Sequence, residues 1–158
     1  MRRSDRAVTS HGEILDIIRR CKVMRIAMVE NGRPYIVPMN FGFAQEGDAL
    51  FLYLHSALQG RKISILQQNP YVCFEADCDH ALLPAEVACQ NGYAYASVIG
   101  YGTATFITNP AEKTAGLNAI MQHQTGKANW EYSAQALDGV CVFYIAVESL
   151  TAKARTIG

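Results

Sequence analysis

The sequence predicts a mainly β protein with inserted helices, folded as a barrel-like sheet. At least six segments have the apolar or alternating texture of strands. Most successive strands are joined by short turns, which favours antiparallel pairing. A closed or nearly closed barrel is the economical way to cover that many strand edges. With 158 residues, the chain has about the length of one ordinary domain, so we expect a single domain over residues 1–158.

The first segments are predicted to be a helix and a hairpin. Ser10, with a glutamate three residues later, is a candidate capping box, and apolar residues follow it at helical spacing. The dipeptide Asn31-Gly32 is typical of a hairpin turn, so we expect the strand over 24–30 to return as a strand over 33–43. Two prolines in the return strand confine it to an edge of the sheet or to an irregular place in it.

The middle of the chain is predicted to contain three strands and one helix. The strand over 49–55 has almost no polar face, so we expect it to be buried on both sides. A short helix over 60–68 ends before an Asn-Pro dipeptide. Strands over 71–76 and 93–107 follow, and the polar, mixed segment over 77–92 between them is expected to be a loop.

The last third of the chain begins with a helix and ends with a strand. Asn109 is a candidate helix cap, with Pro110 at the first helical position. A further short helix is expected to carry Trp130 and Leu137. The apolar segment 140–150 is expected to be the last strand.

Composition limits the classes of function. Lys plus Arg and Asp plus Glu each total 14, and the resulting zero net charge argues against a broad electrostatic nucleic-acid binder. No apolar run in the sequence approaches the ~20 residues of a membrane helix, and the basic start at 1–6 leads into no apolar segment of a signal peptide. Five cysteines at irregular spacing are typical of reduced thiols, so we expect a cytoplasmic protein.

One stretch of eight residues carries the strongest signal for a binding site. His55 ends a predicted strand, and Arg61 and Lys62 open the next helix. Two cations in a first helical turn oppose the helix dipole, and a bound anion would reverse that cost. Backbone N–H groups, the Ser56 hydroxyl and both cations would together suit a phosphate. The alternatives are an exposed basic helix start without a ligand and a His55 with only a structural role.

The strand over 93–107 has two unlike faces in its first two thirds. Alternation puts Tyr95, Ser97 and Tyr101 on one face, and alanines, a valine and two glycines on the other. So bare a face permits close approach of another backbone, a flat ligand or a second subunit. Dense core packing with bulges at the glycines explains the pattern equally well.

A metal site is not expected. Cys73, Cys78, His80 and Cys89 contain no CxxC pair, and Cys73 lies in a predicted strand, so inert thiols are favoured. The sequence also lacks GxGxxG, P-loop and nucleophile-elbow motifs. Nucleotide-binding folds of those kinds and hydrolase triads are therefore unsupported.

Several short motifs occur in order along nearly the whole chain. They are MRRSDR at 1–6, PYIVPMNFG at 34–42, LHSA at 54–57, GRK at 60–62, NP at 69–70 followed by CFE at 73–75, and the segment 95–102. Together they resemble the flavin-binding split-barrel superfamily of pyridoxamine-phosphate oxidase. More narrowly, they are similar to its 5-nitroimidazole reductase (Nim) resistance-protein branch.

The resemblance implies a split β-barrel that forms a homodimer, with a flavin in each of two sites between the subunits. FMN is the expected cofactor, and FAD or haem is the alternative. The implied site residues are Pro38, Met39 and Asn40 beside the isoalloxazine ring, His55 and Ser56 beside the ring and ribityl chain, Arg61 and Lys62 on the phosphate, and Tyr95 and Ser97 from the neighbouring strand or the partner subunit.

The sequence departs from the family pattern in two places. Ala96 stands where the family usually has a basic or bulky residue, which puts contacts there in doubt. The substrate-phosphate signature of a true pyridoxamine-phosphate oxidase is also missing, which argues against that activity.

We therefore expect a flavin-dependent oxidoreductase with nitroaromatic substrates such as 5-nitroimidazoles. The cofactor would perform the redox chemistry, and the protein would supply position and electrostatics. His55 is the expected active-site residue, which would hydrogen-bond or protonate the oxygen being reduced. One alternative is a haem- or flavin-binding sensor or carrier without turnover, with His55 as an axial ligand. Another is a protein that keeps the fold without a cofactor.

Overall fold

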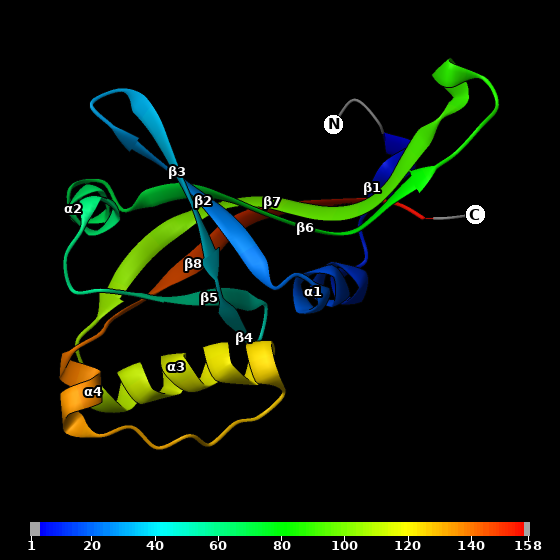
Figure 1. Ribbon diagram of the computed structural model, residues 1–158. Coiled ribbons are helices and arrows are strands. Elements are labelled where there is room, and N and C mark those ends of the chain that lie inside the picture. The colour runs from blue at the N-terminus through cyan, green and yellow to red at the C-terminus, as the bar shows by residue number, and fades with distance from the viewer. Residues whose placement is uncertain (1–3, 157–158) are drawn as a thin grey trace.

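Eight strands form one antiparallel sheet that wraps around a hydrophobic core (Figure 1). The computed structural model describes residues 4–156, so residues 1–3 of the basic start lie outside the described range. The strand order is β3-β2-β6-β7-β8-β5-β4, and β1 pairs with β8. The strands are β1 Ala7–Val8, β2 Val23–Glu30, β3 Arg33–Asn40, β4 Gly42–Glu46, β5 Ala49–Ser56, β6 Tyr71–Leu83, β7 Gly92–Ile107 and β8 Cys141–Arg155.

Four α-helices and two short 3-10 turns complete the described chain. The mainly β class with inserted helices is thereby confirmed. None of these helices is both long and apolar enough to cross a membrane. The helices are α1 His11–Arg20, α2 Arg61–Gln68, α3 Pro110–Thr125 and α4 Ala134–Asp138, and the 3-10 turns are η1 Ser4–Arg6 and η2 Ala88–Gln90.

The two edge strands of the sheet, β3 and β4, are joined by a single residue, Phe41. The chain thus passes directly from one edge of the sheet to the other, and the sheet curls into a split barrel without closing. The single strand expected over 33–43 is wrong, because the pairing partner changes from β2 to β5 at this point. Phe41 is 1% exposed, and burial of its ring in the core fixes the crossing.

The β2–β3 hairpin forms where the sequence predicts it. Asn31 and Gly32 have φ angles of 51° and 76°, the left-handed pair that a tight hairpin turn requires. Pro34 and Pro38 lie on β3, at the edge of the sheet, where a missing N–H costs no ladder hydrogen bond on the outer side.

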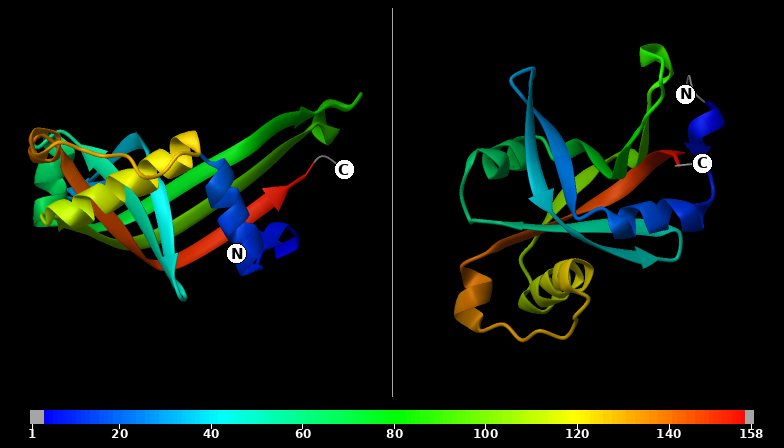
Figure 2. Two further views of the ribbon diagram at one scale, coloured as in Figure 1. Left: turned by 90° about the horizontal axis from the view of Figure 1, so that it is seen from below. Right: turned by 45° about the vertical axis from the view of Figure 1, so that its right-hand side comes forward.

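The β6–β7 hairpin is much longer than expected and projects beyond the core (Figures 1 and 2). The loop expected over 77–92 is wrong in its first half, because β6 continues to Leu83. The register shifts between Cys78 and Ala81, with Asp79 at φ 59°. Of the polar residues that indicated a loop, Asp77 and His80 pair with each other on the extended strand, and Asp79 pairs with Arg20 of α1. The last strand is longer than 140–150 for a similar reason, because β8 runs on along β7 to Arg155.

β7 turns its bare face into the core. A Cβ at Gly100 would lie 2.3 Å from Cζ of Phe74, and one at Gly102 would lie 2.3 Å from the Ala146 carbonyl oxygen. The register also shifts between Tyr101 and Gly102. Core packing with a bulge at the glycines therefore accounts for Gly100 and Gly102, and the Phe74 ring fills the space over Gly100.

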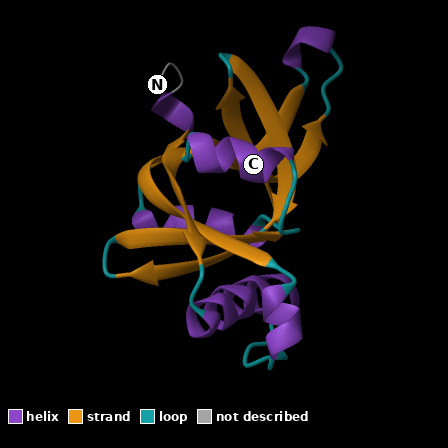
Figure 3. Ribbon diagram, turned by 90° about the vertical axis from the view of Figure 1, so that its left-hand side faces the viewer, coloured by secondary structure: helices purple, strands orange, loops and turns teal. Residues whose placement is uncertain are grey.

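β5 is buried on one side and half-buried on the other. Leu50, Leu52 and Leu54 are at most 6% exposed, whereas the alternate residues Phe51, Tyr53 and His55 are only half-buried. Burial on both sides is therefore wrong. The half-buried face lies beside α3, which packs across β4, β5 and β8 (Figure 3).

The two predicted helix caps lie at helix starts, but only one of them makes the expected side-chain hydrogen bonds. The Asn109 side chain accepts hydrogen bonds from the N–H groups of Ala111 and Glu112 at 2.9 and 3.2 Å, which confirms this cap. Ser10 stands at the N-cap of α1 but makes no side-chain cap hydrogen bond, so the capping box is wrong. Trp130 precedes α4 and does not belong to it.

Candidate functional site

The corner between β5 and α2 holds the residues expected to bind an anion. β5 ends with His55 and Ser56, and α2 begins with Arg61 and Lys62. Gly60, directly before the helix, has a φ of 143°, which residues with a side chain rarely adopt. The entry into α2 therefore depends on this glycine. The first N–H groups of the helix have no intrahelical partners and add donors at the same end.

Arg61 lies across the β2–β3 hairpin. Its Nε and Nη2 atoms donate to Oε2 of Glu30 at 3.0 and 2.8 Å. Its Cζ atom lies 4.3 Å from the centre of the Tyr35 ring, which is within the range of a cation–π contact. The Arg61 charge is therefore already paired, and the side chain fastens α2 to the hairpin.

His55 is the least satisfied polar side chain at this corner. Its Nδ1 atom is buried and has no hydrogen-bond partner. Burial lowers the pKa of His55, and the charge of Lys62 lowers it further, so the ring is neutral at neutral pH. Among the described residues, Lys62 forms no salt bridge. An unpartnered buried nitrogen beside an unpaired ammonium is costly in isolation, and it fits a site that receives a polar, anionic ligand.

A second group of expected site residues lies on the outer face of the sheet. Pro38 and Asn40 on the edge strand β3 are exposed, whereas the Met39 side chain is 9% exposed and lies in the core. Met39 can therefore meet a ligand on this face only through its backbone. Because β3 ends the sheet, alternate N–H and C=O groups of this strand are open on its outer side.

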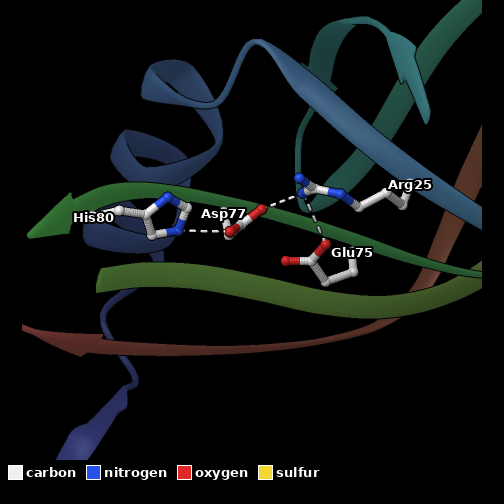
Figure 4. Close-up of polar contacts among 4 residues, drawn as sticks. All are labelled: Arg25, Glu75, Asp77 and His80. Atoms are coloured by element: carbon white, nitrogen blue, oxygen red, sulfur yellow. Dashed lines mark hydrogen bonds and ion pairs between the residues drawn. The ribbon is translucent and has the colours of Figure 1, made fainter. Parts of the chain in front are cut away.

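A network of four charged or titratable side chains occupies the centre of the same face (Figure 4). Arg25 of β2 donates to Glu75 at 3.1 Å and also pairs with Asp77, and Asp77 lies 2.6 Å from Nε2 of His80. Burial and the neighbouring Asp77 raise the pKa of Glu75, against the effect of Arg25. We did not predict this network from the sequence; the alternation of Glu75 and Asp77 along a strand is the signal that could have located half of it.

Tyr95 and Ser97 lie far from His55 within one chain. Ile107 is the β7 residue in the row of His55, because Ile107 pairs with Val142 and Val142 pairs with His55. The strand between residues 97 and 107 spans roughly 30 Å at ~3.3 Å per residue. One chain therefore brings together His55, Ser56 and Lys62 but does not add Tyr95 or Ser97 to them.

Ser97 does border a hollow on the outer face. A cavity of about 320 Å³ is lined by Ser97, Ile99, Thr151 and Lys153. Ile99 is 46% exposed here, and an apolar side chain of this size left open beside a hollow is typical of an interaction surface.

The described residues contain no group of three or more His, Cys, Asp or Glu that could hold a metal ion. All five cysteines are free thiols. Burial raises the pKa of Cys21, Cys78 and Cys141, which keeps these thiols protonated and unreactive.

Comparison with known proteins gives one family and several similar structures. Residues 10–154 match the family described as pyridoxamine 5'-phosphate oxidase. A candidate 5-nitroimidazole antibiotic resistance protein from Bacteroides thetaiotaomicron has 32% sequence identity, a TM-score of 0.81, and coverage of 94% of this chain and 86% of that chain. No curated protein matches the sequence.

Two more distant structures share the fold. The flavocytochrome Anf3 from Azotobacter vinelandii has 21% identity, a TM-score of 0.80, and coverage of 99% of this chain and 72% of that chain. The FAD and haem binding protein from Mycobacterium smegmatis has 17% identity, a TM-score of 0.79, and coverage of 96% of this chain and 74% of that chain.

Proposed function

The chain belongs to the pyridoxamine 5'-phosphate oxidase family, and we propose that it is a flavin-dependent oxidoreductase that binds FMN and reduces nitroaromatic compounds such as 5-nitroimidazoles. The 32% identity to a candidate 5-nitroimidazole resistance protein supports this substrate class. The observation that carries the proposal is the buried, unpartnered Nδ1 atom of His55 beside Lys62. Such an atom favours a bound polar group at this corner.

The phosphate end of FMN would lie at the start of α2. Lys62 would supply the charge, and the Ser56 hydroxyl and the first N–H groups of the helix would supply hydrogen-bond donors. Arg61 contributes less than the motif implies, because Glu30 already holds its guanidinium group. Its role on this proposal is to fasten α2 against the β2–β3 hairpin.

The ring end of the flavin would need two copies of the chain. Pro38, Asn40 and the Met39 backbone would line it from one copy. Tyr95 and Ser97 would line it from the other, since they lie roughly 30–40 Å from the row of His55 along β7. Exposed apolar side chains on the outer face support an interface between copies. Three of them are Ile36 at 60%, Ile99 at 46% and Tyr101 at 45% exposure.

A bound flavin supplies transfer of two electrons at a time. Reduction of a nitro group to a nitroso group consumes two electrons and two protons and releases water, so donors are needed at the substrate oxygen. His55 is neutral at neutral pH because its pKa is lowered, and it would act there as a hydrogen-bond donor that also passes protons from solvent. A second subunit would cover one side of the site and exclude water from it.

An absorbance spectrum of the purified protein, followed by mass analysis of what heat releases, tests the cofactor. We expect the two bands of an oxidised flavin and the mass of FMN. A Soret band would instead support the haem-binding carrier, and a colourless protein that takes up neither group would support a fold without a cofactor. Either result would contradict the proposal.

Turnover of a 5-nitroimidazole tests the reaction. His55→Ala should keep the flavin spectrum and lose about 100-fold or more in rate, while His11→Ala, on an exposed residue at the start of α1, should match the wild-type protein. Unchanged turnover in the His55→Ala variant would contradict the role of His55.

A further inference from the structure

An acidic, aromatic cavity of about 380 Å³ lies between α3 and the half-buried face of β5. Phe51 and Tyr53 of β5 and Tyr144 of β8 form its aromatic part, and Glu46 of β4 and Glu112 of α3 contribute carboxylates. Ile107 and Ala115 complete the lining. None of the residues expected to bind the flavin lines this cavity, although His55 follows Tyr53 on the same face of β5.

The three rings stand at steep angles to one another. The Phe51 and Tyr144 rings have centroids 5.5 Å apart and an interplanar angle of 87°. The Tyr53 and Tyr144 rings are 6.1 Å apart at 57°. In the Phe51–Tyr144 pair the edge of one ring meets the face of the other, and the ring surfaces not used in these contacts can be presented to a shared ligand. Three rings inclined to one another in this way can form the walls of an aromatic cage.

The charge of the cavity has one sign. Glu46 and Glu112 are its charged lining residues, and no lysine, arginine or histidine is among the described residues that line it. Among the described residues, neither carboxylate forms a salt bridge. Lys113, next to Glu112 in sequence, instead donates to the Leu137 and Val140 carbonyl oxygens at 2.8 and 3.0 Å.

Both carboxylates act on the Tyr53 phenol. Burial raises the pKa of Tyr53, and Glu46, Tyr144 and Glu112 raise it further. The Tyr53 phenol therefore stays neutral and keeps its hydroxyl donor, while the negative potential of the cavity comes from the two glutamates. No positive charge of the lining offsets this potential.

We propose that this cavity binds a small organic cation with a quaternary ammonium head. Three rings give cation–π attraction, which favours a diffuse alkylated charge over a compact, strongly hydrated one. Two carboxylates supply the opposite charge, and the volume lies within the roughly 300–1,000 Å³ of small-molecule sites. A divalent metal fits less well, because two carboxylates are fewer oxygen ligands than such ions take.

Choline and its neutral isostere 3,3-dimethylbutan-1-ol test the proposal, because they differ in charge and hardly in shape. Titration of the full-length protein, followed by NMR chemical-shift changes of Tyr53 and Tyr144, should show choline binding at least ~10-fold tighter than the alcohol. Equal affinity for the two probes, or no binding of choline, would overturn the proposal.

Variants separate the contribution of the aromatic rings to choline binding from that of the carboxylates. Tyr144→Leu should weaken choline binding ~10-fold, and Tyr144→Phe, which keeps the ring, should change it little. Glu112→Gln should weaken binding about threefold, whereas Glu131→Gln, outside the cavity, should not. If Tyr144→Leu does not fold, the double variant Glu46→Gln, Glu112→Gln tests the proposal instead. A choline affinity equal to that of the wild-type protein in this variant would contradict the proposal.

Discussion

The Nδ1 atom of His123 lies 2.8 Å from the carbonyl oxygen of Phe41, the residue at which the chain crosses from β3 to β4. The Nε2 atom of the same ring lies 3.1 Å from the Arg19 carbonyl oxygen, near the end of α1. Gln124 of α3 also donates to the Phe41 carbonyl at 2.8 Å. One buried ring on α3 thus joins the barrel crossing to the N-terminal helix.

Replacement of His123 is expected to destabilise the whole fold. His123→Ala removes a side chain that is 8% exposed, together with its contacts to the Phe41 and Arg19 carbonyls, and opens a cavity. We expect a loss of about 2–4 kcal/mol in the free energy of unfolding, measured by urea denaturation. His80→Ala, whose ring is 42% exposed, should cost under ~1 kcal/mol. Equal midpoints for the two variants would show that the crossing does not depend on His123.

Stability should fall on mild acidification. Burial lowers the pKa of both His55 and His123. Lys62 lowers the pKa of His55 further, and for His123 burial and Lys22 outweigh the backbone carbonyls of Phe41 and Arg19, which act in the opposite direction. The folded protein therefore binds fewer protons than the unfolded chain near the ordinary histidine pKa of about 6.5, so stability rises with pH in that range. We expect the urea midpoint to decrease from about pH 7.5 to about pH 6, and less steeply in a His123→Gln variant. A midpoint that increases on acidification would contradict the direction of both shifts.

Local sequence signals predicted most helices and strands. They failed where residues far away in the sequence determine how far a strand extends. The Asn31-Gly32 turn and the Asn109 cap are chemistry within a few residues, and both are confirmed. The extension of β6 to Leu83 is different, because its outer polar side chains are paired across strands, as Asp77 is with Arg25. Arg25 lies 52 residues from Asp77 in the sequence, so the residues around position 77 could not indicate this pairing.

The candidate site divides in the same way. His55, Ser56 and Lys62 could be predicted as one corner because eight consecutive residues hold them. The Arg61–Glu30 pair joins residues 31 positions apart, so the sequence could not show that the Arg61 charge is already paired. The burial of the Met39 side chain in the core was also missed. Which residues of β3 face the core is set by the pairing of β3 with β2.

Gly42 is expected to tolerate no side chain. It begins β4 directly under α3, and a Cβ there would lie 2.3 Å from backbone atoms of Ala119 and Ile120. Because helix backbone cannot give way as a side chain can, Gly42→Ala should cost about 3 kcal/mol or more in the free energy of unfolding.

Gly12→Ala is the matched control for that substitution. Its nearest contact would be Ser10 Oγ at 3.9 Å, and it lies within α1, so we expect a neutral effect or a gain of about 0.5–1 kcal/mol. Thermal unfolding of the two variants compares them directly, and a Gly42→Ala protein as stable as Gly12→Ala would refute the close approach of α3.

Lys62 should distinguish FMN from riboflavin, which lacks the phosphate. Lys62→Met removes the unpaired charge at the start of α2, and loss of a charge-assisted hydrogen bond of about 1.5–3 kcal/mol should weaken FMN binding about 10- to 100-fold. Riboflavin affinity should change less than about twofold. Quenching of flavin fluorescence measures both, with Lys127→Met as the control variant. An equal loss for both flavins would place the phosphate away from Lys62.

Ile99 should couple dimer formation to flavin binding. It is 46% exposed on the outer face, in the row of Glu75 and Thr151, where the proposed second copy would cover it. Ile99→Asp leaves the folded monomer nearly unperturbed because the side chain is already open to water, but it buries a charge in the interface, which is strongly unfavourable. We expect sedimentation equilibrium to show a monomer that has also lost its flavin, since Tyr95 and Ser97 would no longer reach the site. Val87→Asp, at 50% exposure in the segment between β6 and β7, should remain dimeric and yellow. A monomeric Ile99→Asp protein that keeps FMN at wild-type affinity would show that one chain alone completes the site.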